Sequence, residues 1–195
     1  MIAAVKHNLG NLTNFNGRDG RPTFWWYVLF LVVAQYLVGI VATIPMMAGV
    51  MTTAFDAAQA GVDQTQMQET MFAGMADSMR SVMWVGVVTS IVCALLILAS
   101  FVRRLHDSGK SGYWAIIPMV TQAVAMYFSV QMMGQIDEIF AAASDPEQMQ
   151  QIQREMMIQG GGFVGYIGYL FVIVMGVLKS DEGPNQYGDA PVSLS

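Results

Sequence analysis

Apolar residues dominate four long stretches of this chain, and none of the four contains an acidic or basic side chain. No Asp, Glu, Lys or Arg occurs in residues 22–55, 81–102, 111–136 or 156–178. A helix needs about 20 apolar residues to cross the hydrocarbon core of a bilayer, so each stretch is long enough for one crossing. The pattern therefore predicts an all-α, polytopic membrane protein built as a bundle of four transmembrane helices.

The predicted spans cover most of the chain. We place them at residues 24–50, 81–102, 113–133 and 161–178. No internal repeat and no composition shift divides the sequence. We therefore expect one membrane domain over residues 1–195, with short segments before the first span and after the fourth.

The two longer connections between spans also carry helical patterns. In the first connection methionine recurs at every fourth position, at Met67, Met71, Met75 and Met79. This spacing places the four side chains on one face of a helix that runs into the second span. In the second connection Ser144 or Asp145 can cap a helix, Pro146 suits its first position, and the triple glycine 160–162 can end it.

The composition supports a membrane protein and argues against a soluble one. Hydrophobic residues make up 54 % of the 195 residues and charged residues only 12 %, about half the charged share of soluble domains. A soluble protein of this size with four such helices would have too little polar surface. The first apolar run is too long and starts too far from the N-terminus for a cleaved signal peptide, so we expect a retained span.

The charges outside the spans sort by side. Seven of the nine basic residues precede the first span, follow the fourth, or lie between the second and third, namely Lys6, Arg18, Arg21, Arg103, Arg104, Lys110 and Lys179. The two longer connections hold nine acidic residues and only two basic ones, Arg80 and Arg154. Because basic residues stay on the cytoplasmic side, the charge pattern places both termini in the cytoplasm.

Small residues recur along two of the spans. They are Gly86, Ser90 and Ala94 in the second span and Gly161, Gly165 and Gly168 in the fourth. In lipid, such positions let helix backbones approach one another closely. We expect both faces to pack against neighbouring helices.

The segment "RRLHDSGKSGYW", residues 103–114, holds five ionisable side chains between two apolar runs. Its "SGKSG" resembles the end of a phosphate-binding loop, but that motif needs glycine where Arg104 stands and a strand before it. His106, Asp107 and Ser108 are adjacent and point in different directions, which disfavours a catalytic triad. With only two histidines in the chain, we expect no metal site, no cofactor and no enzymatic activity.

Membrane anchoring explains most of this segment. Basic residues suit the last turn of a helix, and Gly109 suits the left-handed residue that ends it. Asp107 can form a local ion pair with Arg103 or Arg104, which would contribute little at an exposed site. An acid near the membrane usually has a more distant partner, so we look for one in "GRDGR" before the first span and "GPNQYG" after the fourth.

Three segments that are distant in the sequence thus emerge on the same cytoplasmic face. We predict that they form an interfacial polar cluster of Arg18, Arg21, Arg103, Arg104, His106, Asp107, Lys110, Asp181, Asn185 and Tyr187. Such a cluster could lock the end of the bundle or hold an anionic lipid headgroup. The expected partners are the bilayer, anionic headgroups, and a second copy or another membrane protein, but no nucleic acid.

The same three segments carry a family resemblance. The matching residues are Phe15, Gly17, Arg18, Phe24 and Trp25, then Arg103, Arg104, Leu105, His106, Asp107, Gly109, Ser111, Gly112 and Trp114, then Gly183, Asn185, Tyr187, Gly188 and Pro191. In this order they resemble the bacterial inner-membrane family called domain of unknown function 805. Gly20 and Pro22 depart from its usual residues, and the two acidic connections look longer than in the family. The resemblance implies a bacterial inner-membrane location and no particular activity.

Two other functions are weighed against a non-enzymatic binding protein. A small transporter or channel component is the main alternative, but ion pathways usually need ionisable groups inside the membrane, and the spans contain none. An oligomer would then have to build the pore. The methionine stripe could also gather Cu(I) through its thioethers, although an apolar packing stripe is the preferred interpretation.

Overall fold

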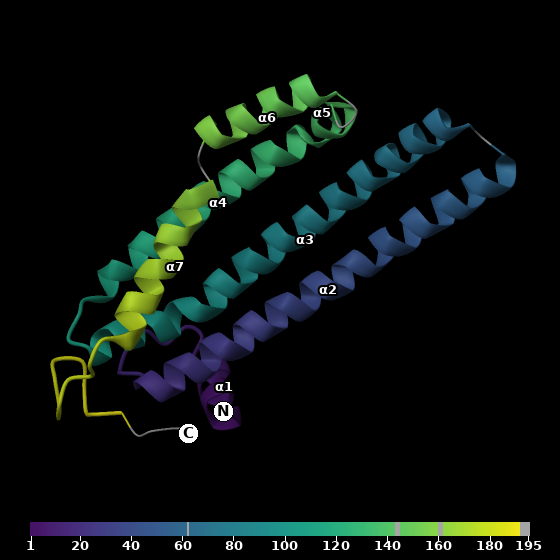
Figure 1. Cartoon of the computed structure of the whole chain (residues 1–195). Helices are drawn as coiled ribbons and strands as arrows, with labels where there is room; N and C mark the ends of the chain where they lie inside the picture. The colour runs from purple at the N-terminus through teal and green to yellow at the C-terminus, as the bar shows by residue number, and fades with distance from the viewer. Residues whose placement is uncertain (62, 143–144, 160–161, 192–195) are drawn as a thin grey trace. The chain divides into compact units, whose positions relative to one another are not determined.

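A computed structural model gives the fold and describes residues 1–61, 63–142, 145–159 and 162–191. Apart from one isolated β-bridge between Asn185 and Gly188, the regular secondary structure of these residues is helical (Figure 1). The helices are α1 (Ile2–Gly10), α2 (Arg21–Ala60), α3 (Gln64–Asp107), the 3₁₀ turn η1 (Gly112–Ala115), α4 (Ile116–Gly134), α5 (Ile136–Ala141), α6 (Pro146–Gln159) and α7 (Gly162–Val177). The predicted all-α class is confirmed.

Within the described residues, three helical segments are long and apolar enough to cross a membrane. They are Arg21–Ala60, Thr70–Asp107 and Gly112–Gly134, and Phe163–Val177 is a shorter apolar helix. The predicted spans fall within α2, α3, η1 with α4, and α7, except that residue 161 lies outside the described residues and Leu178 follows the end of α7 at Val177. The bounds of α2 and α3 are much wider than the predicted spans, because both helices continue into the first long connection.

The helices predicted in the two long connections are present. In the first connection, the methionine-rich segment is the N-terminal part of α3 rather than a separate helix. In the second, α6 begins at Pro146, and Asp145 Oδ1 accepts hydrogen bonds from the Glu147 and Gln148 amides. Asp145 is therefore the cap, whereas Ser144 and two of the three glycines lie outside the described residues.

The chain divides into two compact units. Unit 1 comprises Met1–Tyr36, Thr89–Ala125 and the residues from Phe163 on, and unit 2 comprises Leu37–Val88 and Met126–Gly162. The core of unit 1 gathers Phe24, Phe101, Val102, Leu105 and Ala115 from α2, α3 and η1. In unit 2, Ala76, Met133 and Ile136 form a second core, against which Met79 packs. At least this methionine of the stripe therefore has a packing role.

Glycines let α7 approach α4 closely within unit 1. A Cβ atom added at Gly168 would lie 2.2 Å from Thr121 Oγ1 and 3.3 Å from Pro118 Cα, and one at Gly165 would lie 3.1 Å from Ala125 Cβ. Around Gly86, by contrast, nothing lies within 4 Å of an added Cβ. The packing prediction is confirmed for Gly165 and Gly168 and wrong for Gly86, while Gly161 lies outside the described residues.

The Gly168 contact makes a stability prediction. Gly168→Ala should lower the free energy of unfolding by about 1–3 kcal/mol, because the new methyl group forces α7 away from α4. Thermal denaturation in mild detergent would measure the loss. Gly86→Ala is the matched control and should be neutral or slightly stabilising. Adding Thr121→Ala should recover part of the loss, and equal effects of the two glycine substitutions would contradict the packing assignment.

Candidate functional site

The last turn of α3 presents the charged residues of the candidate site. The Lys110 amide donates to the Leu105 carbonyl at 2.9 Å, and the Gly109 amide donates to the His106 carbonyl at 3.1 Å. Together with a φ of +67° at Gly109, these bonds form the glycine-terminated C-cap known as a Schellman motif. The prediction for Gly109 is confirmed. The cap ends the helix immediately after Asp107, so the last turn is free to contact segments from elsewhere in the chain.

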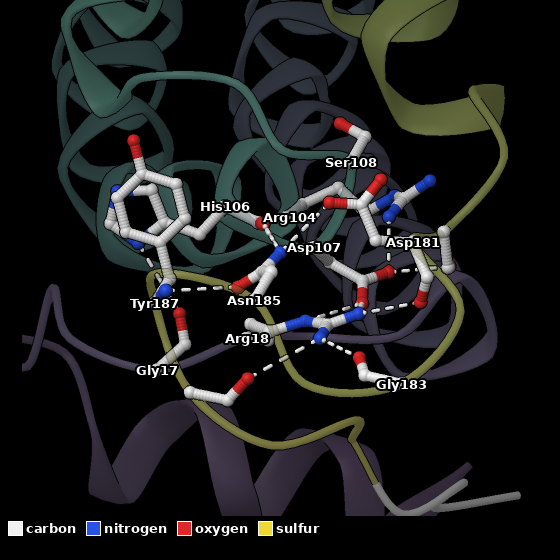
Figure 2. A network of polar contacts seen from close by, with 12 residues as sticks. Gly17, Arg18, Arg104, His106, Asp107, Ser108, Asp181, Gly183, Asn185 and Tyr187 are labelled. Carbon is white, nitrogen blue, oxygen red and sulfur yellow. Dashed lines mark hydrogen bonds and ion pairs between the residues drawn. The ribbon is translucent and has the colours of Figure 1, made fainter.

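Asp107 is the centre of one buried network, which we call the Asp107 network and which comprises Asp107, Arg18, Arg104 and Ser180 (Figure 2). Arg18 donates to Asp107 Oδ1 from both Nε and Nη2, at 3.2 and 3.0 Å. Asp107 Oδ2 accepts from Arg104 Nη1 and from the Ser180 hydroxyl, each at 2.5 Å. Both oxygens of this carboxylate are therefore occupied by donors from three separate segments.

The two arginines of the Asp107 network also bind backbone carbonyls. Arg104 donates from Nε to the Gly176 carbonyl at 3.0 Å and from Nη2 to the Leu178 carbonyl. These carbonyls end α7, where backbone acceptors lack helical partners and the helix dipole is negative. Arg18 donates to the carbonyls of Asp181 and Gly183, at 2.9 and 2.7 Å. The arginines thus hold the end of α7 and the tail (residues 178–191) against α3.

Arg103 belongs to a second network. Its Nε donates to Asp19 Oδ2 at 3.0 Å, and Asp19 also contacts His7 Nε2 at 3.1 Å and the Ser100 hydroxyl at 3.2 Å. We call these four residues, Asp19, Arg103, His7 and Ser100, the Asp19 network. Arg103 further donates to the Asn8 side chain at 2.7 Å and to the carbonyls of Asn11 and Asn14. This network fastens α1 and the linker (residues 11–20) to α3.

The arginine and aspartate side chains of both networks are buried. The side chains of Arg18, Arg103 and Arg104 are at most 4 % exposed, and those of Asp19 and Asp107 at most 1 %. Three positive charges and two negative charges leave a net charge of one positive in the protein interior. Within the described part of the chain, no buried side-chain nitrogen or oxygen lacks a hydrogen-bond partner. Two carboxylates cannot neutralise all three buried arginines. Backbone carbonyl oxygens therefore accept the remaining hydrogen bonds of the guanidinium groups.

His106 connects the linker to the tail. Its Nδ1 lies 3.2 Å from the Gly17 carbonyl, which can only accept, so Nδ1 carries the proton. The ring stacks on Tyr187 with centroids 3.9 Å apart and planes at 4°, and the His106 carbonyl accepts from Asn185 Nδ2 at 2.9 Å (Figure 2). His106 follows the apolar stretch 81–102, and burial lowers the pKa of its imidazole, partly opposed by the Gly17 contact. The neutral ring suits this stacked position.

Most of the predicted cluster residues come together, and two do not. Arg18, Arg104, His106, Asp107, Asp181, Asn185 and Tyr187 share one set of contacts, while Arg103 takes part in the Asp19 network. Arg21 and Lys110 are exposed, and neither side chain has a hydrogen bond or ion pair to another described residue. Of the two local ion pairs considered for Asp107, Arg104 forms one and Arg103 does not.

Sequence reasoning missed several residues of the two networks. The predicted cluster does not include Asp19, although Asp19 lies in "GRDGR" between two cluster arginines. The predicted cluster also lacks His7 and Asn8. No helix is predicted before the first span, whereas this segment forms α1. Ser100 and Ser180 gave no signal, because a single hydroxyl in an apolar run or a tail is common.

The Asp107 network and the Asp19 network bind segments of the chain to one another, and we call the two networks together the polar lock. Asp107 and Asp19 accept from arginine or serine donors, so neither carboxylate is free to take a proton from a substrate. In the described residues, no three His, Cys, Asp or Glu side chains converge as metal ligands. The arrangement can hold three chain segments together and present a positive surface around them.

Helices long and apolar enough to cross a membrane indicate a helical membrane protein, and a buried arginine–aspartate lock joins the chain segments at one end of unit 1. The chain belongs to the family of proteins of unknown function called DUF805, whose sequence profile matches residues 12–189. The match covers both arginines of the Asp107 network and leaves α1 outside. No curated protein and no solved structure matches the chain.

Proposed function

We propose that the protein is a non-enzymatic protein of the bacterial inner membrane with four spans and both termini in the cytoplasm. In this proposal the Asp107 and Asp19 networks keep the cytoplasmic end rigid. The exposed cations next to them, Arg21 and Lys110, bind anionic lipid headgroups. A second copy or another membrane protein could use the same surface.

The proposed fourth span is α7. Its 16 residues rise about 24 Å, less than the roughly 30 Å of an average hydrocarbon core. A bilayer accommodates a short span by thinning locally, at a modest free-energy cost. Arg104 binds the carbonyls of Gly176 and Leu178 at the end of α7, which supports a helix end at the membrane surface.

The distribution of charge over the two units supports the proposed orientation. Unit 1 contains seven basic and five acidic residues, a net charge of +2, whereas unit 2 contains two basic and nine acidic residues, a net charge of −7. The two values add to the −5 of the whole chain. Positive segments stay in the cytoplasm, so unit 1 carries the proposed cytoplasmic end.

The orientation makes a direct prediction. Green fluorescent protein fused after the C-terminus should fluoresce, and alkaline phosphatase inserted after Gly61 should be active, because the first folds in the cytoplasm and the second outside it. Exchanging the two reporters is the control and should abolish both signals. Active alkaline phosphatase at the C-terminus would contradict the orientation.

The observation that carries the headgroup proposal is the difference between buried and exposed cations. Arg18, Arg103 and Arg104 direct their donors to partners inside the protein, so they cannot also bind a phosphate. Arg21 and Lys110 are exposed beside them. The buried excess of one positive charge adds to the potential that an anionic headgroup meets there.

Headgroup binding is tested by native mass spectrometry of the protein released from nanodiscs that contain phosphatidylglycerol and phosphatidylcholine. The wild type should retain phosphatidylglycerol selectively. Arg21→Gln and Lys110→Gln should each weaken retention about fivefold, since a basic residue at an anionic surface contributes about 1 kcal/mol. Arg154→Gln removes the same charge from exposed α6 and is the control. Equal retention by all four proteins would refute headgroup binding.

A further inference from the structure

A cavity of about 190 Å³ lies among the helices of unit 1. Its walls come from the first part of α2, the last part of α3, the first part of α4 and α7, all within unit 1. An engineered apolar cavity of about 150 Å³ stays dry and binds benzene. The cavity in this protein is therefore large enough for a six-membered ring or a short piece of hydrocarbon chain.

The walls of the cavity restrict the charge of a ligand. They are mainly apolar and aromatic, with Trp25 near the end that carries the lock, and no Asp, Glu, Lys, Arg or His lines the cavity. An unpaired charge is very unfavourable in such surroundings. A ligand that fits is uncharged and mostly apolar, which distinguishes this site from the headgroup surface.

Besides the Ser90 hydroxyl of α3, three amide or phenol side chains from three different helices line the cavity. They are Gln35 of α2, Gln122 of α4 and Tyr169 of α7. In the part of the chain that the structure describes, none of the three side chains makes a hydrogen bond. An amide or phenol without a partner is unfavourable in hydrocarbon. Amide N–H and phenol O–H groups are donors, so they suit a ligand with a carbonyl oxygen.

The depth of the two glutamines in the membrane further restricts which class of ligand can reach them. Gln35 is 11 residues after Phe24, and Gln122 is nine residues after Tyr113, which corresponds to about 16 and 14 Å along the helices. Both amides then lie near the middle of a hydrocarbon core about 30 Å thick. A phospholipid in its usual place keeps its ester and phosphate groups at the surface, far from these amides.

We propose that the cavity binds an uncharged, carbonyl-bearing molecule dissolved in the membrane core, with its oxygen held by Gln35, Gln122 and Tyr169. Two sources offer this chemistry, a quinone ring on an apolar tail and a fatty-acyl ester. Apolar packing in the cavity supplies most of the affinity, and the polar side chains select the carbonyl. The site is independent of the headgroup surface, so either assignment can fail alone.

Cys93 provides the readout, because it is the single cysteine of the chain and lines the cavity. The experiment measures the rate at which a membrane-permeant maleimide alkylates Cys93 in the full-length protein in nanodiscs. The probes are a decyl-benzoquinone whose other three ring positions carry methyl groups, methyl decanoate and decylbenzene. The fully substituted quinone has no free ring position to which the Cys93 thiol could add, and decylbenzene has a similar body and no carbonyl. We expect at least one carbonyl probe to slow alkylation about tenfold and decylbenzene to have little effect.

Two variants make the test specific. Gln35→Leu with Gln122→Leu should remove most of the protection, whereas Gln131→Leu, which alters α4 outside the cavity, should keep it. Should the double variant not fold, Ala94→Leu fills the cavity and should remove protection by every probe. Protection by the quinone or by the ester alone would support the proposal and identify the source. Equal protection by decylbenzene, none by either carbonyl probe, or full protection in the glutamine variant would overturn it.

Discussion

Asp107→Asn should lower the free energy of unfolding by about 3–5 kcal/mol, the loss typical of a buried ion pair with one partner removed. The substitution leaves the guanidinium groups of Arg18 and Arg104 buried without their carboxylate. Unfolding in mixtures of mild detergent and dodecyl sulfate would measure the difference. The tail should also become sensitive to protease, because the Ser180 contact to Asp107 is weakened.

Asp189→Asn is the matched control for Asp107→Asn. Asp189 is an exposed residue of the same tail, so the same chemical change should alter stability by no more than about 0.5 kcal/mol. Adding Arg18→Gln to Asp107→Asn should cost less than Arg18→Gln costs in the wild type, since the ion pair between the two residues is already lost. A small effect of Asp107→Asn, close to that of Asp189→Asn, would mean that the ion pairs do not form.

Arg103→Met should release α1 and the linker while leaving the tail in place. Arg103 bonds to Asp19, to the Asn8 side chain and to two linker carbonyls, and each bond from a charged donor contributes about 1.5–3 kcal/mol. Amide hydrogen exchange should therefore become at least about tenfold faster in residues 2–14. Exchange in residues 181–189 should change little.

Arg103→Lys is the control that separates the effect of the side chain's shape from the effect of its positive charge. A single ammonium group keeps the positive charge but cannot reproduce the planar fork that reaches Asp19 and the linker together. Its exchange rates should lie between those of the wild type and Arg103→Met. Faster exchange in the tail as well as in α1 would show that the Asp19 and Asp107 networks are one cooperative unit, contrary to this description.

Much of the helical architecture could be predicted from charge-free apolar stretches and from capping residues. Asp145 and Pro146 marked the start of α6, and Gly109 marked the end of α3, because each residue acts through local backbone geometry. The full length of α2, which continues to Ala60, could not be predicted. Polar residues in the first connection are compatible with helix or loop, and the spacing rule for apolar residues does not distinguish between them.

The sequence indicates which residues gather at the candidate site, but it does not indicate which residue bonds to which. Topology predicts that Arg18, His106 and Tyr187 lie on one face, and the structure places His106 against Tyr187 and against the carbonyl of Gly17, the neighbour of Arg18. The partner of Arg103 depended on three-dimensional geometry, since Asp107 is at the favourable four-residue spacing but Asp19 is the acid it contacts. Backbone carbonyls, which accept many of the arginine bonds, leave no trace in a sequence.

The burial of the cations changed the functional interpretation. In the sequence alone, Arg18, Arg103 and Arg21 cannot be distinguished, because each is a basic residue next to a predicted span. The structure separates two that are internally bonded from one that is exposed. The proposed headgroup site therefore consists of the exposed cations Arg21 and Lys110 and not of the whole predicted cluster.

The central claim is that Arg18 and Asp107, 89 residues apart, bind each other directly in the lock. A double-mutant cycle with Arg18→Gln and Asp107→Asn tests it through the free energy of unfolding. Direct contact predicts that the two losses are not additive and that the coupling energy is about 2–3 kcal/mol. Additive losses, with a coupling energy below about 0.5 kcal/mol, would contradict the claim.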